Sequence, residues 1–201
     1  TDTDYEHAPT YDWVEISPNY GGPGTSVGLG DFGDEQDDTK TLDLPFEFQY
    51  YGEAFDRVSI CSNGWIAMGR TYITNYRNWN LPCAGAPAYM IAPWWDNLCQ
   101  SGNDRVYHHY DAAGHRYIIE WDNLRVVLST SPSSYREKFQ VILYDPAHHE
   151  TDTGDGMILF QYHTVNNVDS EQQYATAGIM NGENTDGVLY EYFDDPGPGA
   201  A

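Results

Sequence analysis

Apolar and polar positions along this chain follow the two-residue period of β-strands, and little of it has the period of an amphipathic helix. Short alternating or wholly apolar runs are separated by Gly, Pro, Asn and Asp, as in sandwiches and barrels. We therefore expect an all-β fold, an antiparallel, jelly-roll-like β-sandwich of about ten or eleven strands. The expected strands lie at 11–16, 41–51, 57–61, 65–69, 88–95, 105–111, 115–127, 137–145, 156–165, 174–180 and 187–193.

One turn is specified in detail by its residues. The Asn63-Gly64 pair predicts a two-residue type I′ hairpin, because both central positions of that turn need positive φ. Such a hairpin sets Ser62 opposite Trp65 and places Trp65 on the same face as Ile60. Both faces of the hairpin are largely apolar, so Trp65 is expected in the core and not on a ligand platform.

The chain contains no internal repeat and no shift in composition, which favours one domain at residues 11–193. Residues 1–10 are expected to form an entering linker or an N-terminal segment pinned to the fold. Residues 194–201, "DDPGPGAA", are expected to form a linker tail.

The charge of the chain is strongly one-sided. Asp and Glu number 31 against 9 Lys and Arg, which gives a formal net charge of −22. Such a surface repels phosphate groups, so nucleic acids and anionic membranes are excluded as partners. No apolar run is long enough to insert into a membrane. Three explanations stay open for the acids: solubility, adaptation to saline surroundings, and binding of divalent cations.

A set of segments in a fixed order carries a family resemblance: "LDLPFEFQYYGEAFDRVSICSNGWIAMG", "MIAPWWDNL", "YIIEWDNLR", "FQVILYDP", "GDGMILFQYHTVNN" and "ATAGIMNGENTDGVLY". Together they resemble an accessory β-sandwich module of large secreted bacterial proteins, often found beside gingipain-like or subtilisin-like peptidase domains. They are also distantly similar to the nidogen-type extracellular domain. The resemblance spans residues 11–193. It implies a secreted, extracellular or cell-surface location, neighbouring domains in the same chain and no catalytic residues.

Closely spaced carboxylates make the segment "GDFGDEQDDTK" the main candidate for a calcium site. Ca²⁺ prefers carboxylate and carbonyl oxygens on a flexible, Gly-containing loop, although the spacing does not match an EF-hand. A solvated acidic loop is the alternative. A secondary candidate is the acidic start of the chain. The predicted metal ligands are Asp31, Asp34, Asp37 and Asp38, with Asp2 and Asp4 at the N-terminus.

The three cysteines leave at least one thiol unpaired. Cys61 lies in an expected strand, where a lone cysteine is usually a small buried hydrophobe. Cys83 and Cys99 flank turn-rich sequence, and in an exported protein we expect a disulfide between them. Three free thiols are the alternative.

Aromatic residues mark the expected ligand site. Adjacent Trp94 and Trp95 send one ring to each face of a strand, and one ring is expected on an exposed rim. Trp79 and Tyr76 lie near them in the sequence. The expected partner is a glycan or another surface protein, and burial of both adjacent rings is the alternative.

An enzyme is the competing hypothesis. Glu120 and Asp122, or either with Asp96, could form the carboxylate pair of a glycosidase. Strand alternation instead favours Ile119 and Trp121 in the core, with Glu120 and Asp122 in solvent.

The sequence thus predicts a non-catalytic extracellular module that serves in binding, spacing or surface display. Ca²⁺ is its expected structural ion. A carbohydrate-binding module or a glycoside-active enzyme is the alternative, and a subunit of a surface filament is the third.

Overall fold

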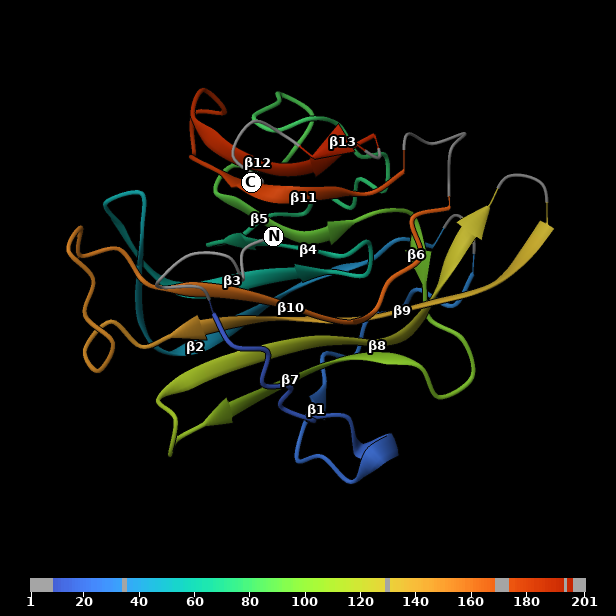
Figure 1. Cartoon of the computed structure of the whole chain (residues 1–201), viewed down its shortest axis with the longest axis horizontal. Helices are drawn as coiled ribbons and strands as arrows, with labels where there is room; N and C mark the ends of the chain where they lie inside the picture. Colours follow the sequence, from blue (N-terminus) through green and yellow to red (C-terminus); the bar gives the residue numbers. More distant parts are fainter. Residues whose placement is uncertain (1–8, 34–35, 129–130, 169–173, 194, 197–201) are drawn as a thin grey trace.

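A computed structural model describes residues 9–33, 36–128, 131–168, 174–193 and 195–196. Within these ranges thirteen strands and one 3₁₀ helix, η2 (Pro18–Tyr20), form two antiparallel sheets (Figure 1). Three of the strands contain only two residues, so the number exceeds the ten or eleven expected. The predicted all-β sandwich is confirmed. No helix in the described part of the chain is long and apolar enough to cross a membrane.

Sheet A has the strand order β1-β7-β8-β9-β10, and β6 pairs with β8 beyond its stretch opposite β7. Its strands are β1 (Thr25–Ser26), β6 (Leu98–Cys99), β7 (Arg105–Asp111), β8 (Arg116–Leu128), β9 (Ser131–Tyr144) and β10 (Ile158–Thr164).

Sheet B has the order β13-β12-β11-β5-β4-β3-β2. Its strands are β2 (Thr39–Tyr50), β3 (Glu53–Cys61), β4 (Trp65–Met68), β5 (Met90–Trp95), β11 (Thr176–Met180), β12 (Gly187–Tyr192) and β13 (Asp195–Pro196).

The connectivity differs from that of a jelly roll. Hydrogen-bonded neighbours are mostly consecutive in the chain, so β2 to β5 and β7 to β10 are meanders. The two Greek keys of a jelly roll would place non-consecutive strands side by side. Alternation along a strand does not specify which strand lies beside it, so this connectivity comes from the structure alone.

The main core lies between the two sheets. Trp121 and Phe139 from β8 and β9 stack there with their ring centroids 5.0 Å apart. Ile119 points into the same core, as its alternation with Trp121 predicts. Each such side chain stabilises the fold by about 1.5–3 kcal/mol when it leaves water.

The β3–β4 hairpin has a loop one residue longer than predicted. Cys61 pairs with Trp65 and Ile60 with Ile66, so the loop contains three residues and the predicted register was wrong. Gly64 takes φ +77°, the left-handed conformation that ends a common three-residue hairpin loop. As a result Ile60 and Ile66 enter the main core, whereas Cys61 and Trp65 face the outer side of sheet B. Trp65 is fully buried, as expected, but in a different layer.

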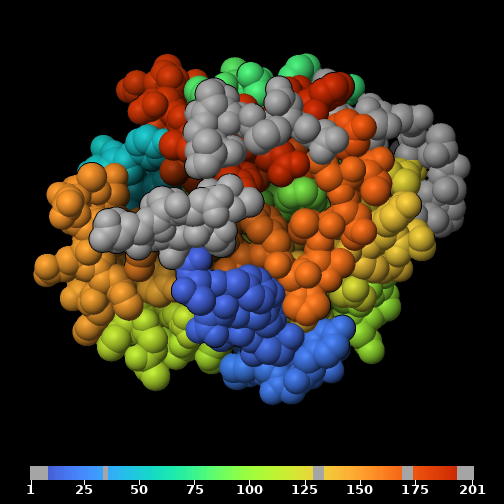
Figure 2. Space-filling view, viewed as in Figure 1, coloured from blue at the N-terminus to red at the C-terminus, as the bar shows by residue number. Residues whose placement is uncertain are grey.

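Each sheet is covered on its outer side by an irregular segment. Residues 9–24 cross the outer face of sheet A and are seen as the blue surface in Figure 2. Residues 70–89 cover the outer face of sheet B. The strand expected at 11–16 is absent: these residues have no regular secondary structure, and their backbone bonds to side chains such as Gln140 and Gln161 instead of a neighbouring strand.

Candidate functional site

Residues 70–89, all but the first residue of the connection between β4 and β5, run for 20 residues without regular secondary structure. We call this segment the covering loop; it lies at the top of Figure 1, beside β12. Loops of this length in compact domains are uncommon and usually have a function. Leu81 and Ala86 anchor the covering loop in an apolar cluster with Trp65 and Trp95.

Hydrogen bonds from sheet B fix the backbone of the covering loop. The indole N–H groups of Trp65 and Trp95 both donate to the carbonyl oxygen of Asn75, at 3.1 and 3.0 Å. The hydroxyl of Thr176 on β11 donates to the carbonyl oxygen of Trp79 at 3.0 Å. Because its backbone is fixed before any ligand arrives, the covering loop would lose little conformational entropy on binding.

Trp94 and Trp95 are 4% and 0% exposed, so neither can form a surface platform and that prediction was wrong. β5 is an interior strand of sheet B, and both of its faces are covered. Trp94 packs in the main core against Tyr162, and Trp95 lies beneath the covering loop. Tyr76 and Trp79, the other two predicted ligand residues, are 41% and 43% exposed.

The covering loop also exposes residues that the sequence reasoning missed. Tyr72 is 81% exposed, the highest value among the large hydrophobic side chains in the described ranges. The guanidinium of Arg70 donates to the Tyr72 hydroxyl at 3.3 Å. With Tyr76 and Trp79, Tyr72 gives the covering loop three exposed aromatic side chains.

The absence of acids from this region is the sequence signal that was missed. No Asp or Glu occurs from Arg57 to Trp95, where an even distribution of the 31 acids would place about six. The central strands of sheet B are buried and explain part of the run. The covering loop is not a strand, yet it has no acid and contains both Arg70 and Arg77. Its own residues carry a formal charge of +2, in a protein with a net charge of −22.

A buried charge cluster fastens residues 9–24 to sheet A. Lys138 on β9 lies 2.9 Å from carboxylate oxygens of both Glu15 and Asp122 and 3.2 Å from Glu120. Its ammonium also sits 4.0 Å from the ring centroid of Tyr20. Burial lowers the pKa of Lys138, but hydrogen bonds to Asp122 and Glu15 outweigh burial and raise it.

Glu120 and Asp122 are therefore buried, and the expectation that they face solvent was wrong. Residues 9–24 cover this face: the amide of Ile16 donates to Glu120 at 3.3 Å, and the hydroxyl of Ser17 donates to Asp122 at 2.6 Å. Burial raises the pKa of Glu120 despite the nearby Lys138. The carboxylate pair binds the protein's own lysine and leaves no open cleft for a sugar.

Three of the six predicted metal ligands lie among the described residues. Asp34, Asp2 and Asp4 lie outside the described residues. Asp31 is fully buried, and Asp37 and Asp38 lie close enough to affect its pKa. Within the described ranges no three His, Cys, Asp or Glu side chains gather closely enough to hold a metal ion by themselves.

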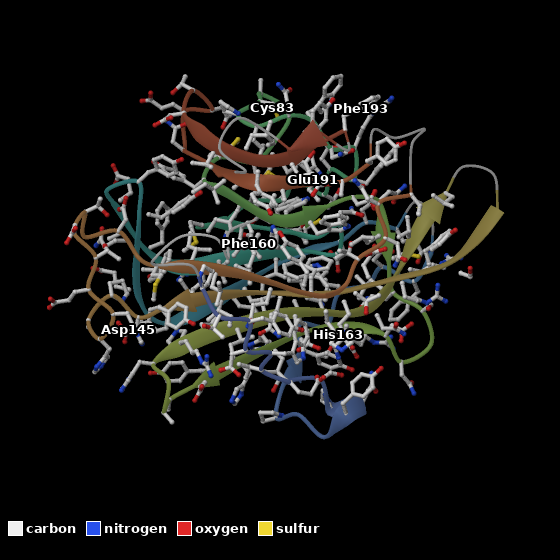
Figure 3. All side chains as sticks on the ribbon, viewed as in Figure 1. Cys83, Asp145, Phe160, His163, Glu191 and Phe193 are labelled. Carbon is white, nitrogen blue, oxygen red and sulfur yellow. The ribbon has the colours of Figure 1, made fainter. Side chains whose placement is uncertain are left out.

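All three cysteines are free thiols, so the Cys83–Cys99 disulfide was a wrong prediction. Cys83 belongs to the covering loop outside sheet B and is labelled at the top of Figure 3. Cys99 lies in β6 of sheet A, where the guanidinium of Arg125 donates to its sulfur at 3.3 and 3.1 Å. Proximity in the sequence does not bring the two residues together because β5 and β6 belong to different sheets.

An apolar groove of about 410 Å³ lies where β10 meets β11 and β12. Phe160, labelled on β10 in Figure 3, lines it with Ile179 and Tyr190. None of the four predicted ligand residues lines this groove.

Comparison with known proteins places the chain in a family. The family model described as "NIDO related" matches residues 10–195, nearly the whole chain. No curated protein and no solved structure gives a significant match. The resemblance to a nidogen-type domain is confirmed at this level, and the neighbouring peptidase domains stay a prediction. The chain therefore belongs to the NIDO-related, that is nidogen-related, family.

Proposed function

We propose that this chain is a non-catalytic extracellular module that binds carbohydrate through the covering loop. Membership of a nidogen-related family supports an extracellular context. Spacing between domains or display at a cell surface would be compatible with the same role. The buried, lysine-paired positions of Glu120 and Asp122 give no support to the glycosidase alternative.

One observation carries the proposal: three exposed aromatic side chains project from a backbone that sheet B fixes in place. Tyr72, Tyr76 and Trp79 are 81%, 41% and 43% exposed. Amphipathic aromatic side chains provide large contact area at low entropic cost, and Trp and Tyr dominate binding hot spots. Exposed rings of this kind suit the apolar faces of sugar rings, and the exposed Asn80 and Arg77 can bond sugar hydroxyl groups.

A glycan array followed by calorimetry on the strongest hit tests the proposal. Trp79→Ala should weaken binding at least about tenfold, the usual loss for a hot-spot residue. Tyr110→Ala is the matched control, because Tyr110 is 36% exposed but lies on β7 of sheet A. Absence of any glycan hit would overturn the proposal, as would equal losses in both variants.

A further inference from the structure

The carboxylate of Asp31 has no hydrogen-bond donor. The residue precedes β2, its side chain is 0% exposed, and neither carboxylate oxygen accepts a hydrogen bond. The Ser62 hydroxyl and the Gly33 amide lie nearby, but neither forms a hydrogen bond to a carboxylate oxygen of Asp31. An ionised carboxylate that is buried without donors or a counter-ion is strongly unfavourable.

The surroundings of Asp31 add further oxygen atoms and negative charge. The Gln100 amide nitrogen donates to the carbonyl oxygens of Leu29 and Asp31, at 2.9 and 3.1 Å. This fixes the Gln100 side chain and leaves its amide oxygen buried without a donor. Asp37 and Asp38 lie close enough to interact electrostatically with Asp31, and they add negative charge to the same region.

The acidic side chains around Asp31 are held in place by the rest of the fold. Asp38 accepts hydrogen bonds from the amides of Gly30 and Thr39, at 2.7 and 2.9 Å. Asp37 accepts one from the Asn63 side chain, in the β3–β4 turn, at 2.8 Å. A buried set of oxygens with more acceptors than donors is the environment that a hard cation satisfies.

We propose that Asp31 anchors a Ca²⁺ site at the junction of the β1–β2 segment, the β3–β4 turn and Gln100. Its ligands would be the two Asp31 oxygens, with the Gln100 amide oxygen and the Asp37 carboxylate as further candidates and water completing the shell. Ca²⁺ accepts such irregular sets of six to eight oxygens, whereas Mg²⁺ requires near-octahedral geometry. The site would join segments from both sheets, and it does not depend on the covering loop binding a glycan.

Thermal unfolding followed by circular dichroism tests the proposal, with the protein first freed of metal by a chelator. Calcium chloride at a hundred times the dissociation constant should raise the melting temperature of the wild type by about 5 °C or more. Asp31→Asn removes the buried charge and the anchoring ligand. It should melt above the wild type in chelator, and calcium should no longer change its melting temperature.

Asp56→Asn is the control for diffuse binding to the acidic surface. The Asp56 side chain is 84% exposed, and this variant should keep the full response to calcium. Calorimetry on the wild type should find one calcium site, which tests the proposal even if Asp31→Asn fails to fold. Absence of any such site overturns it, as does an equal shift with magnesium chloride or a shift that survives in Asp31→Asn.

Discussion

Glu137 should make the protein less stable as the pH rises. Its side chain is fully buried on β9, and both oxygens accept hydrogen bonds from Asn166, at 2.8 Å from the backbone amide and 3.2 Å from the side chain. Burial outweighs these bonds and raises the pKa of Glu137 from 4.5 to about 7. The folded protein therefore holds this proton more tightly than the unfolded chain.

The sign and size of the effect follow from that difference. The stabilising contribution is complete below pH 4.5 and is lost as the pH rises through about 7. A pKa difference of about 2.5 corresponds to about 3 kcal/mol of unfolding free energy. Gln is a neutral isostere of the protonated acid, so Glu137→Gln should remove this pH dependence. The stability of the variant relative to the wild type should rise by about 3 kcal/mol between pH 4.5 and pH 8.

Urea unfolding at a series of pH values measures this difference directly. Glu53→Gln is the matched control, because it removes the same charge from an exposed position on β3. Subtracting the control corrects for the general relief of repulsion in a protein with net charge −22. The reasoning is refuted if Glu137→Gln and Glu53→Gln show the same pH dependence.

Three further outcomes are expected. Gly64→Ala should destabilise the protein by more than about 2 kcal/mol, as measured by urea unfolding. Gly64 has φ +77°, and an added Cβ would lie 1.8 Å from the Trp94 carbonyl oxygen. A loss of stability below about 1 kcal/mol would show that the turn can shift. Lys138→Met should cost about 3–5 kcal/mol, because it leaves three carboxylates without their cation. Limited proteolysis should then cut residues 9–24 first, and equal resistance in wild type and variant would contradict this. Alkylation in denaturant without reductant should modify all three cysteines, as counted by mass spectrometry. Modification of only one thiol would instead indicate a disulfide between Cys83 and Cys99.

The local sequence pattern was enough to predict the strands and the sandwich. It could not predict features that depend on contacts between residues far apart in the sequence. The Asn63-Gly64 pair correctly predicted a hairpin and gave the wrong register. Contacts beyond the hairpin hold that turn: the Trp94 amide donates to the Gly64 carbonyl at 3.2 Å, and the Leu98 amide donates to the Asn63 side chain at 3.0 Å. A two-residue rule cannot include partners 30 or more positions away.

The same limit applies to the candidate sites. Alternation along β8 correctly sent Ile119 and Trp121 inward, and the opposite face was assigned to solvent because nothing local shows that residues 9–24 cover it. Lys138, one of only two lysines, was the available signal of a partner for Glu120. In the covering loop, Trp79 was found from its residue type, whereas the missing acids around it required a view of the whole chain.

The burial of the tryptophans makes the protein a reporter of its own ligand binding. All six lie in the described part of the chain; Trp79 alone is exposed, Trp13 is half-buried and the others are enclosed. Quenchers dissolved in water should therefore reach Trp79 before the enclosed indoles and selectively dim its fluorescence. Any molecule that settles on the covering loop would shield that one ring, so unlabelled protein could be titrated by emission alone.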